Sequence, residues 1–307
     1  MRTQFIRTAT KRLDTFHSAS YFSPITAAEY DALGLSRSAQ YFAARSCALG
    51  AASAELVAAT FFSFNPERIA AVVPECWQIA PPTEVHEARI RGVRTLLATL
   101  EAALEASAAT ELRQAAIRTH RNLAPVIGAQ PISGRPLYAA HLAAFRGGLA
   151  NSTEDVPLLD LWVTTTLLRE YRGDGHIAAL VAHGLSGLEA SVLDCATGRA
   201  WRPSSARRSR GWSEDAWRAA AGGLAARGLL SDESDASVLT ESGLALKETL
   251  ETATDRSVHS AWSVIDDDTL EEVRQDAKLI AGIVVEAGLL PQKLFGREPA
   301  PSAPQAP

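Results

Sequence analysis

Apolar residues recur three and four positions apart along most of the chain, and the strict alternation typical of strands is scarce. This spacing places apolar side chains on one face of a helix. We therefore expect a mainly α-helical protein. Helices are predicted over residues 37–63, 86–106, 109–127, 136–146, 158–172, 175–183, 186–195, 214–227 and 242–254.

Turn-forming residues suggest how these helices divide. Gly147-Gly148 and the polar stretch NSTEDVP place the best domain boundary at about 147–157. The prediction is a helical domain over 1–150 and a second domain over 151–294. The tail, 295–307, is rich in proline and alanine and is predicted to be disordered.

The pattern of the second half indicates a particular fold. Ser213 can cap a helix that Gly228 ends, a polar tip follows (SDESDAS), and Val238-Leu239-Thr240 has the character of a strand. A long helix then begins near residue 242. This order predicts a winged helix-turn-helix domain with a short β-hairpin wing.

Composition limits the class of protein. A net charge of -5 gives no support to broad binding of nucleic acid. The three cysteines have no Cys-x-x-Cys spacing, which fits a reducing compartment and argues against a disulfide frame or structural zinc. The basic N-terminus has no long apolar core, so a secretory leader is not expected, and no stretch reaches the uncharged apolar length that a membrane helix needs. A cytoplasmic protein without a membrane partner or a cofactor is expected.

The stretch Arg172-Gly173-Asp174-Gly175-His176 is the most unusual in the chain. One interpretation is a turn in which Asp174 caps a new helix and Arg172 forms a salt bridge. The other is a site between the two halves, with Arg172 holding an anion, Asp174 orienting His176, and His176 acting as hydrogen-bond donor or general base. Both interpretations remain open.

Other candidates for chemistry are single residues. Ser53 could act as a nucleophile if the first half folds onto the motif, although no Gly-x-Ser-x-Gly elbow exists. Arg45 lies in an apolar helix, where it is either buried against a carboxylate or extended to water. Arg45 and Trp77 are candidate ligand-binding residues. A metal site is not predicted, because no dense His/Cys spacing supports one.

The sequence gives only weak support to DNA binding. The recognition helix would be 214–227, and the candidate contacts are Arg207, Arg208, Arg210 and Arg218. Residues 201–250 carry seven basic and seven acidic side chains, whereas a DNA-reading module needs an excess of cations for the phosphates.

Several stretches carry a family resemblance: YFAARSCALG (41–50), LVAATFFSFNP (56–66), SGRPLYAA (133–140), LLREYRGDGH (167–176) and RGWSEDAW (210–217). On these the chain resembles an actinobacterial helix-turn-helix family with a helical N-terminal half and a MarR-like winged-helix C-terminal half. It departs from that pattern at Ala48, where a proline is usual, and at Tyr171, where a histidine is usual. The resemblance implies a regulatory role, and a lipolytic one is attached to some related proteins.

Two functions follow as hypotheses. The first is a winged-helix transcriptional regulator that responds to a small ligand, binds DNA weakly and forms a homodimer through residues 244–256 and 269–288. The second is a hydrolase, esterase-like, or another enzyme that uses Arg172, Asp174 and His176. Whether the protein is an enzyme is left open by the sequence.

Overall fold

The computed structural model describes residues 2–148, 156–291 and 294. The first half contains α1 (Arg2–Ser18), η1 (Ala19–Tyr21), α2 (Pro24–Ala32), α3 (Arg37–Ser46), η2 (Cys47–Leu49), α4 (Ala54–Thr60), α5 (Pro66–Ala70), α6 (Cys76–Ile79), α7 (Pro82–Ala102), α8 (Ala106–Gly128) and α9 (Pro136–Gly148). The second half contains α10 (Pro157–Ala182), α11 (Gly187–Ala196), α12 (Pro203–Arg210), α13 (Glu214–Ala226), α14 (Glu241–Trp262) and α15 (Asp267–Glu286). The expectation of a mainly α-helical protein agrees with this composition.

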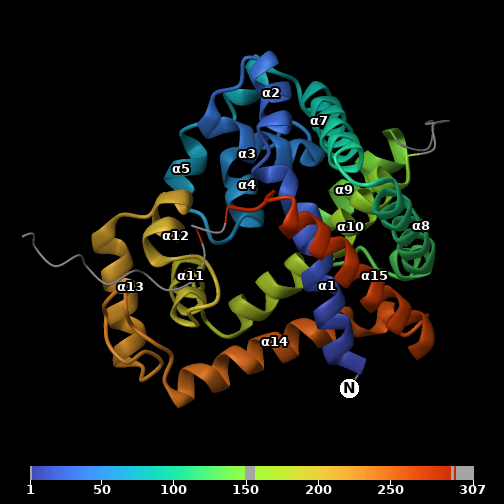
Figure 1. The fold of residues 1–307 in the computed structure, drawn as a ribbon. Helices are drawn as coiled ribbons and strands as arrows, with labels where there is room; N and C mark the ends of the chain where they lie inside the picture. The colour runs from blue at the N-terminus through green and yellow to red at the C-terminus, as the bar shows by residue number, and fades with distance from the viewer. Residues whose placement is uncertain (1, 149–155, 292–293, 295–307) are drawn as a thin grey trace, which may run out of the picture.

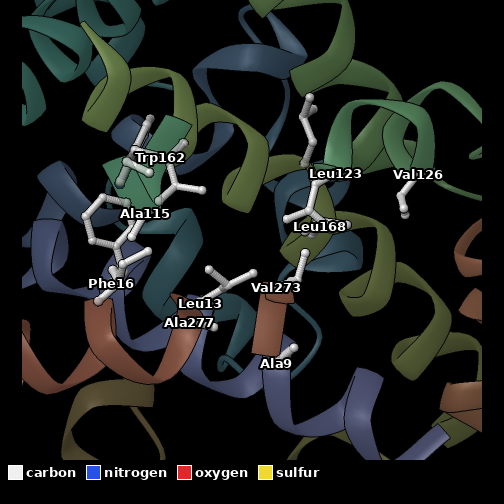
Figure 2. Close-up of a cluster of buried hydrophobic side chains, with 14 of the residues drawn as sticks. Ala9, Leu13, Phe16, Ala115, Leu123, Val126, Trp162, Leu168, Val273 and Ala277 are labelled. Carbon is white, nitrogen blue, oxygen red and sulfur yellow. The ribbon is translucent and has the colours of Figure 1, made fainter. Parts of the chain in front are cut away.

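The largest hydrophobic core joins the two ends of the chain. Helix α1 packs along α15 and against α10, while α8 packs against both α10 and α15 (Figure 1). Figure 2 shows Leu13 and Phe16 of α1 close to Trp162 of α10 and Ala277 of α15. Because this core draws on residues from both sides of residue 150, burial of apolar surface holds the two halves together.

Two smaller cores flank the largest one. One lies among α2 to α7 around Phe42, Val57 and Ile69. The other lies among the end of α10 and α11 to α14, around Trp217 and Leu224. The predicted boundary at 147–157 falls mostly on residues 149–155, which lie outside the described part of the chain, as does the tail after Leu294.

The winged helix with a β-hairpin was a wrong prediction. Within the described ranges there is no strand, and only one antiparallel bridge, Leu230 with Leu239, stands where the wing was expected. The cause is local. The Asp232 carboxylate accepts from the Ser234 N–H, and the Ser237 hydroxyl accepts from the Asp232 N–H. Such side-chain bonds compete with a β-ladder for the backbone groups.

Two predicted helix boundaries are also corrected. The helix expected over 37–63 is divided into α3, η2 and α4, because Gly50 has φ 74° and ends the first part. The two helices expected on either side of Gly173 are one continuous helix, α10. A helical glycine costs about 1 kcal/mol, and the burial of most of α10 outweighs that cost.

No helix in the described ranges is by itself long and apolar enough to cross a membrane. Helices α10 and α11 would reach the required length and composition only together, and they meet at 102°.

Candidate functional site

A cavity of about 460 Å³ lies where the two halves meet. We call it the junction cavity. Its walls come from α1, α3, residues 60–64, α10, α11, α12 and α14, so that both halves contribute to it. Its lining includes Arg45, Arg172, Asp174, His176 and Arg210. Four of these were predicted as ligand-binding or catalytic residues, and Arg210 was predicted as a DNA contact. All five line the same cavity.

The stretch from Arg172 to His176 lies inside α10. Its second glycine, Gly175, leaves room for the Arg135 side chain, which passes close to the helix there. Arg135 donates to the carbonyl oxygens of Tyr171 and Ser257, at 2.6 and 2.7 Å. A Cβ on Gly175 would collide with the Arg135 guanidinium and the Ser257 hydroxyl. Glycine therefore stands at 175 because other groups approach the helix closely, and not because the chain turns there.

Asp174 caps a helix, although not the one expected. Its carboxylate accepts a hydrogen bond from the backbone N–H of Tyr138, at 3.0 Å, in the first turn of α9. The residue is 7% exposed. Burial raises the pKa of Asp174 to about 6, while the Tyr138 N–H opposes that rise. The carboxyl group that Asp174 brings to the junction cavity thus has a pKa above its ordinary value.

His176 is held in one tautomer by α14. Its Nδ1 lies 2.9 Å from the Thr254 hydroxyl, and that hydroxyl donates its only proton to the Leu250 carbonyl, at 2.7 Å. Nδ1 must therefore carry the proton that it shares with Thr254, which leaves the lone pair on Nε2. Burial lowers the pKa of His176 and favours the neutral ring. The ring can accept a hydrogen bond from a molecule in the cavity.

Arg172 pairs with α14 and not with Asp174. Its guanidinium lies 2.8 Å from the Glu251 carboxylate and 3.3 Å from Asp255. Arg7 of α1 reaches Asp255 as well, at 2.6 Å. These contacts tie α1, α10 and α14 together along one edge of the cavity, so the carboxylates of α14 already neutralise the predicted anion clamp.

A buried ion network that the sequence did not reveal surrounds Glu170. The Arg45 guanidinium lies 3.2 Å from the Glu170 carboxylate, and Arg169 lies 2.7 Å from it. Burial alone would raise the pKa of Glu170, but the two arginines hold it well below its usual range. Arg45 also lies over the Phe61 ring, at 4.5 Å. Of the two alternatives for Arg45, the structure has the one buried against a carboxylate.

The remaining candidates lie elsewhere. Ser53 is exposed and caps α4, where it accepts from the Leu56 N–H. Trp77 is buried in the core of the first half and donates to the Ala52 carbonyl. Neither lines the junction cavity. Among the hydrogen bonds of the described chain, none joins His176 to a serine or cysteine, so the pairing that an esterase needs is not formed here.

Three of the four predicted DNA contacts are engaged within the chain. Arg207 pairs with Asp235, and Arg218 pairs with Glu214. Arg210 lies over the Trp201 ring, at 5.4 Å. Arg208 alone of the four is exposed without such a contact in the described structure. The ion pairs thus partly neutralise two of the four predicted DNA contacts.

Helices α12 and α13 are joined by a short turn and form a helix-turn-helix arrangement. Helix α12 ends at Gly211, whose φ is 76°, and α13 begins after the cap Ser213, as predicted. The turn is fixed to the first half: Asn65 donates to the Gly211 carbonyl, and the Trp212 indole donates to the Ser63 carbonyl, at 2.9 and 3.0 Å. A tight glycine-containing turn between two helices is the usual form of this motif.

Comparison with known families agrees with that geometry. A family described as "Helix-turn-helix family" matches residues 6–291. The chain belongs to this helix-turn-helix family. The match covers both halves, and thus the helical N-terminal region and the segments that line the junction cavity as well as α12 and α13. Neither the curated proteins nor the solved structures contain a match.

Proposed function

We propose that this protein is a helix-turn-helix regulator that binds DNA weakly and responds to a small molecule held in the junction cavity. Membership of the helix-turn-helix family supports the regulatory part. The observation that carries the proposal is the segment 62–65. It lines the cavity through Phe62, Ser63 and Phe64, and it also holds the turn between α12 and α13.

The ligand is an amphipathic molecule with polar groups of both kinds. The cavity offers hydrogen-bond donors and cations in Arg45, Arg169 and Arg210, and it offers acceptors in Asp174 and the neutral His176. Aromatic and aliphatic side chains fill the walls between these groups. Small-molecule sites are typically concave and combine apolar walls with convergent polar groups, and the lining of the junction cavity has many charged side chains beside its apolar ones.

Coupling to DNA would pass through segment 62–65. Gly187, the first residue of α11, packs against the Phe62 carbonyl, and the backbone N–H of Asn65 donates to the Arg210 carbonyl, at 2.9 Å. A ligand that shifts Phe62 or Phe64 would therefore shift the ends of α11 and α12.

The homodimer remains a prediction. Most apolar side chains of α15 pack inside the chain, which leaves few of them for a second copy. Leu244 and Val285 are exposed in the two segments that were expected to form the interface.

DNA binding should be weak and sensitive to salt. We expect a dissociation constant in the micromolar range or weaker at physiological salt, because Arg207 and Arg218 are paired with carboxylates. Fluorescence anisotropy on sites selected from random duplexes measures this. The Arg208→Gln variant should lower the slope of log K against log salt by about one per bound copy, and the control Arg218→Gln by less. Sequence-specific nanomolar binding at physiological salt would contradict the proposal.

A further inference from the structure

A second cavity of about 360 Å³ lies in the first half, among η1, α2, α3 and α7. Tyr21, Phe22, Tyr30, Tyr41 and Arg89 are among the residues that line it. We call it the Arg89 cavity. It shares no lining residue with the junction cavity, so a ligand bound here would be distinct from the one proposed above.

Arg89 is a buried cation without a carboxylate. The residue is 1% exposed, and it forms no ion pair with any residue that the structure describes. Its Nη1 donates to His141 Nε2, at 3.0 Å, and its guanidinium lies 4.9 Å from the Trp162 ring centre. Its Nη2 is buried and has no hydrogen-bond partner in the described chain. A buried charge left in this state is unfavourable unless a counter-ion compensates it.

The neighbouring groups cannot supply the missing negative charge. His141 donates from Nδ1 to the Leu137 carbonyl, at 2.9 Å, and burial lowers its pKa to about 3, so its ring is neutral. The Cys47 thiol donates to the Ala44 carbonyl, and burial raises its pKa. Burial also raises the pKa of Tyr21 and of Tyr30. All four groups are uncharged at neutral pH.

Glu170 does not compensate Arg89 either. Its two oxygens accept hydrogen bonds from Arg45 and Arg169. The two positive charges of these arginines already outweigh the single negative charge of the carboxylate. Asp14 balances Arg169 from the other side, at 2.8 Å. The three arginines therefore have two carboxylate partners between them, and Arg89 is the one left over.

We propose that the Arg89 cavity binds an aromatic carboxylate as the counter-ion of Arg89. The carboxylate accepts from Arg89 Nη2 and from the Tyr21 hydroxyl, which is also buried without a hydrogen-bond partner in the described chain. The ring of the ligand contacts Phe22, Tyr30 and Tyr41. A guanidinium recognises a carboxylate through parallel hydrogen bonds, and aromatic walls favour a flat apolar body.

Benzoate and its neutral analogue benzamide test this on the full-length protein by isothermal titration. Benzoate should bind the wild-type protein at least about tenfold more tightly than benzamide, the scale of one charged hydrogen bond. The Arg89→Gln variant should lose that preference. Arg91→Gln is the matched control, because Arg91 lies on the same helix but is exposed and pairs with Glu29.

Two further variants separate binding in the Arg89 cavity from a loss of folding and from binding in the junction cavity. Tyr21→Phe removes a hydroxyl that bonds nothing in the described chain, so the variant should melt like the wild type yet bind benzoate several-fold more weakly. His176→Asn, in the junction cavity, should bind benzoate like the wild type. Equal affinity for benzoate and benzamide, no binding of benzoate at millimolar concentration, or full binding by Tyr21→Phe and Arg89→Gln would each overturn the proposal.

Discussion

Replacing Glu170 by glutamine should lower the free energy of unfolding by about 3–5 kcal/mol, the usual cost of removing one partner from a buried ion pair. The carboxylate is almost fully buried and lies within 3.2 Å of Arg45 and 2.7 Å of Arg169. Without it, the buried Arg45 and the half-buried Arg169 are left with too little negative charge. Urea denaturation followed by circular dichroism measures the change.

Two comparisons make this prediction specific. Glu29→Gln breaks an exposed pair with Arg91 and should change the free energy of unfolding by less than about 1 kcal/mol. The double variant Arg45→Met/Glu170→Met removes the charge together with its partner and should recover part of the loss. A Glu170→Gln protein as stable as the wild type would show that the buried ion network does not contribute to the free energy of unfolding as expected.

Gly187→Ala should destabilise the protein by about 2–3 kcal/mol, as overpacking against a fixed neighbour does. The added Cβ would lie far inside contact distance of the Phe62 carbonyl oxygen, and that neighbour is backbone, which cannot rotate away. Helix α11 would have to move away from segment 62–65, so the junction cavity should open at the same time. Thermal unfolding gives the stability, and hydrogen exchange at residues 60–66 reports the opening.

The same substitution elsewhere provides the control. Gly282 of α15 has nothing within 4 Å of an added Cβ, so Gly282→Ala should raise the free energy of unfolding by up to about 1 kcal/mol. Opposite signs for the two alanine variants are expected. Destabilisation by both variants would mean that the packing of Gly187 is not the cause.

Helix positions were predictable because periodicity and capping are local. The expected cap at Ser186 is a capping box with Glu189, and Ser213 caps α13. The break expected at Gly173 is absent because tertiary packing keeps the helix continuous. Most of α10 is buried along nearly its whole length. The low helix propensity of glycine favoured a turn at this position, but the burial of α10 outweighs that preference.

The site was predictable as a location and not as a set of contacts. One of the two interpretations of the sequence placed Arg172, Asp174 and His176 between the two halves; the three residues line the junction cavity, and their role as a site stays a prediction. It did not reveal that Asp174 caps α9 or that His176 bonds Thr254, because these partners are 36 and 78 residues away along the chain. Glu170 was missed, although an arginine buried in an apolar helix, Arg45, required such a partner.

The wing was predicted from the order of the elements alone, and the structure has only a single bridge there, flanked by side-chain hydrogen bonds. Val238-Leu239-Thr240 is a short run, and the serine and aspartate residues before it bond to their own backbone. Tertiary contacts likewise changed the basic run before α13. Arg207 and Arg210 looked available to phosphates, and they are directed to Asp235 and to aromatic rings.

Coupling between the junction cavity and the helix-turn-helix is tested most directly by DNA affinity measured with and without a compound that binds the cavity. A thermal-shift screen of amphipathic metabolites supplies the compound, which should stabilise the wild type and the His183→Asn control but not His176→Asn. His183 lies at the C-terminal end of α10 and does not line the cavity. The compound should then change DNA affinity at least about fivefold in the wild type and in His183→Asn only. An unchanged affinity, or the same change in His176→Asn, would contradict the proposed regulation.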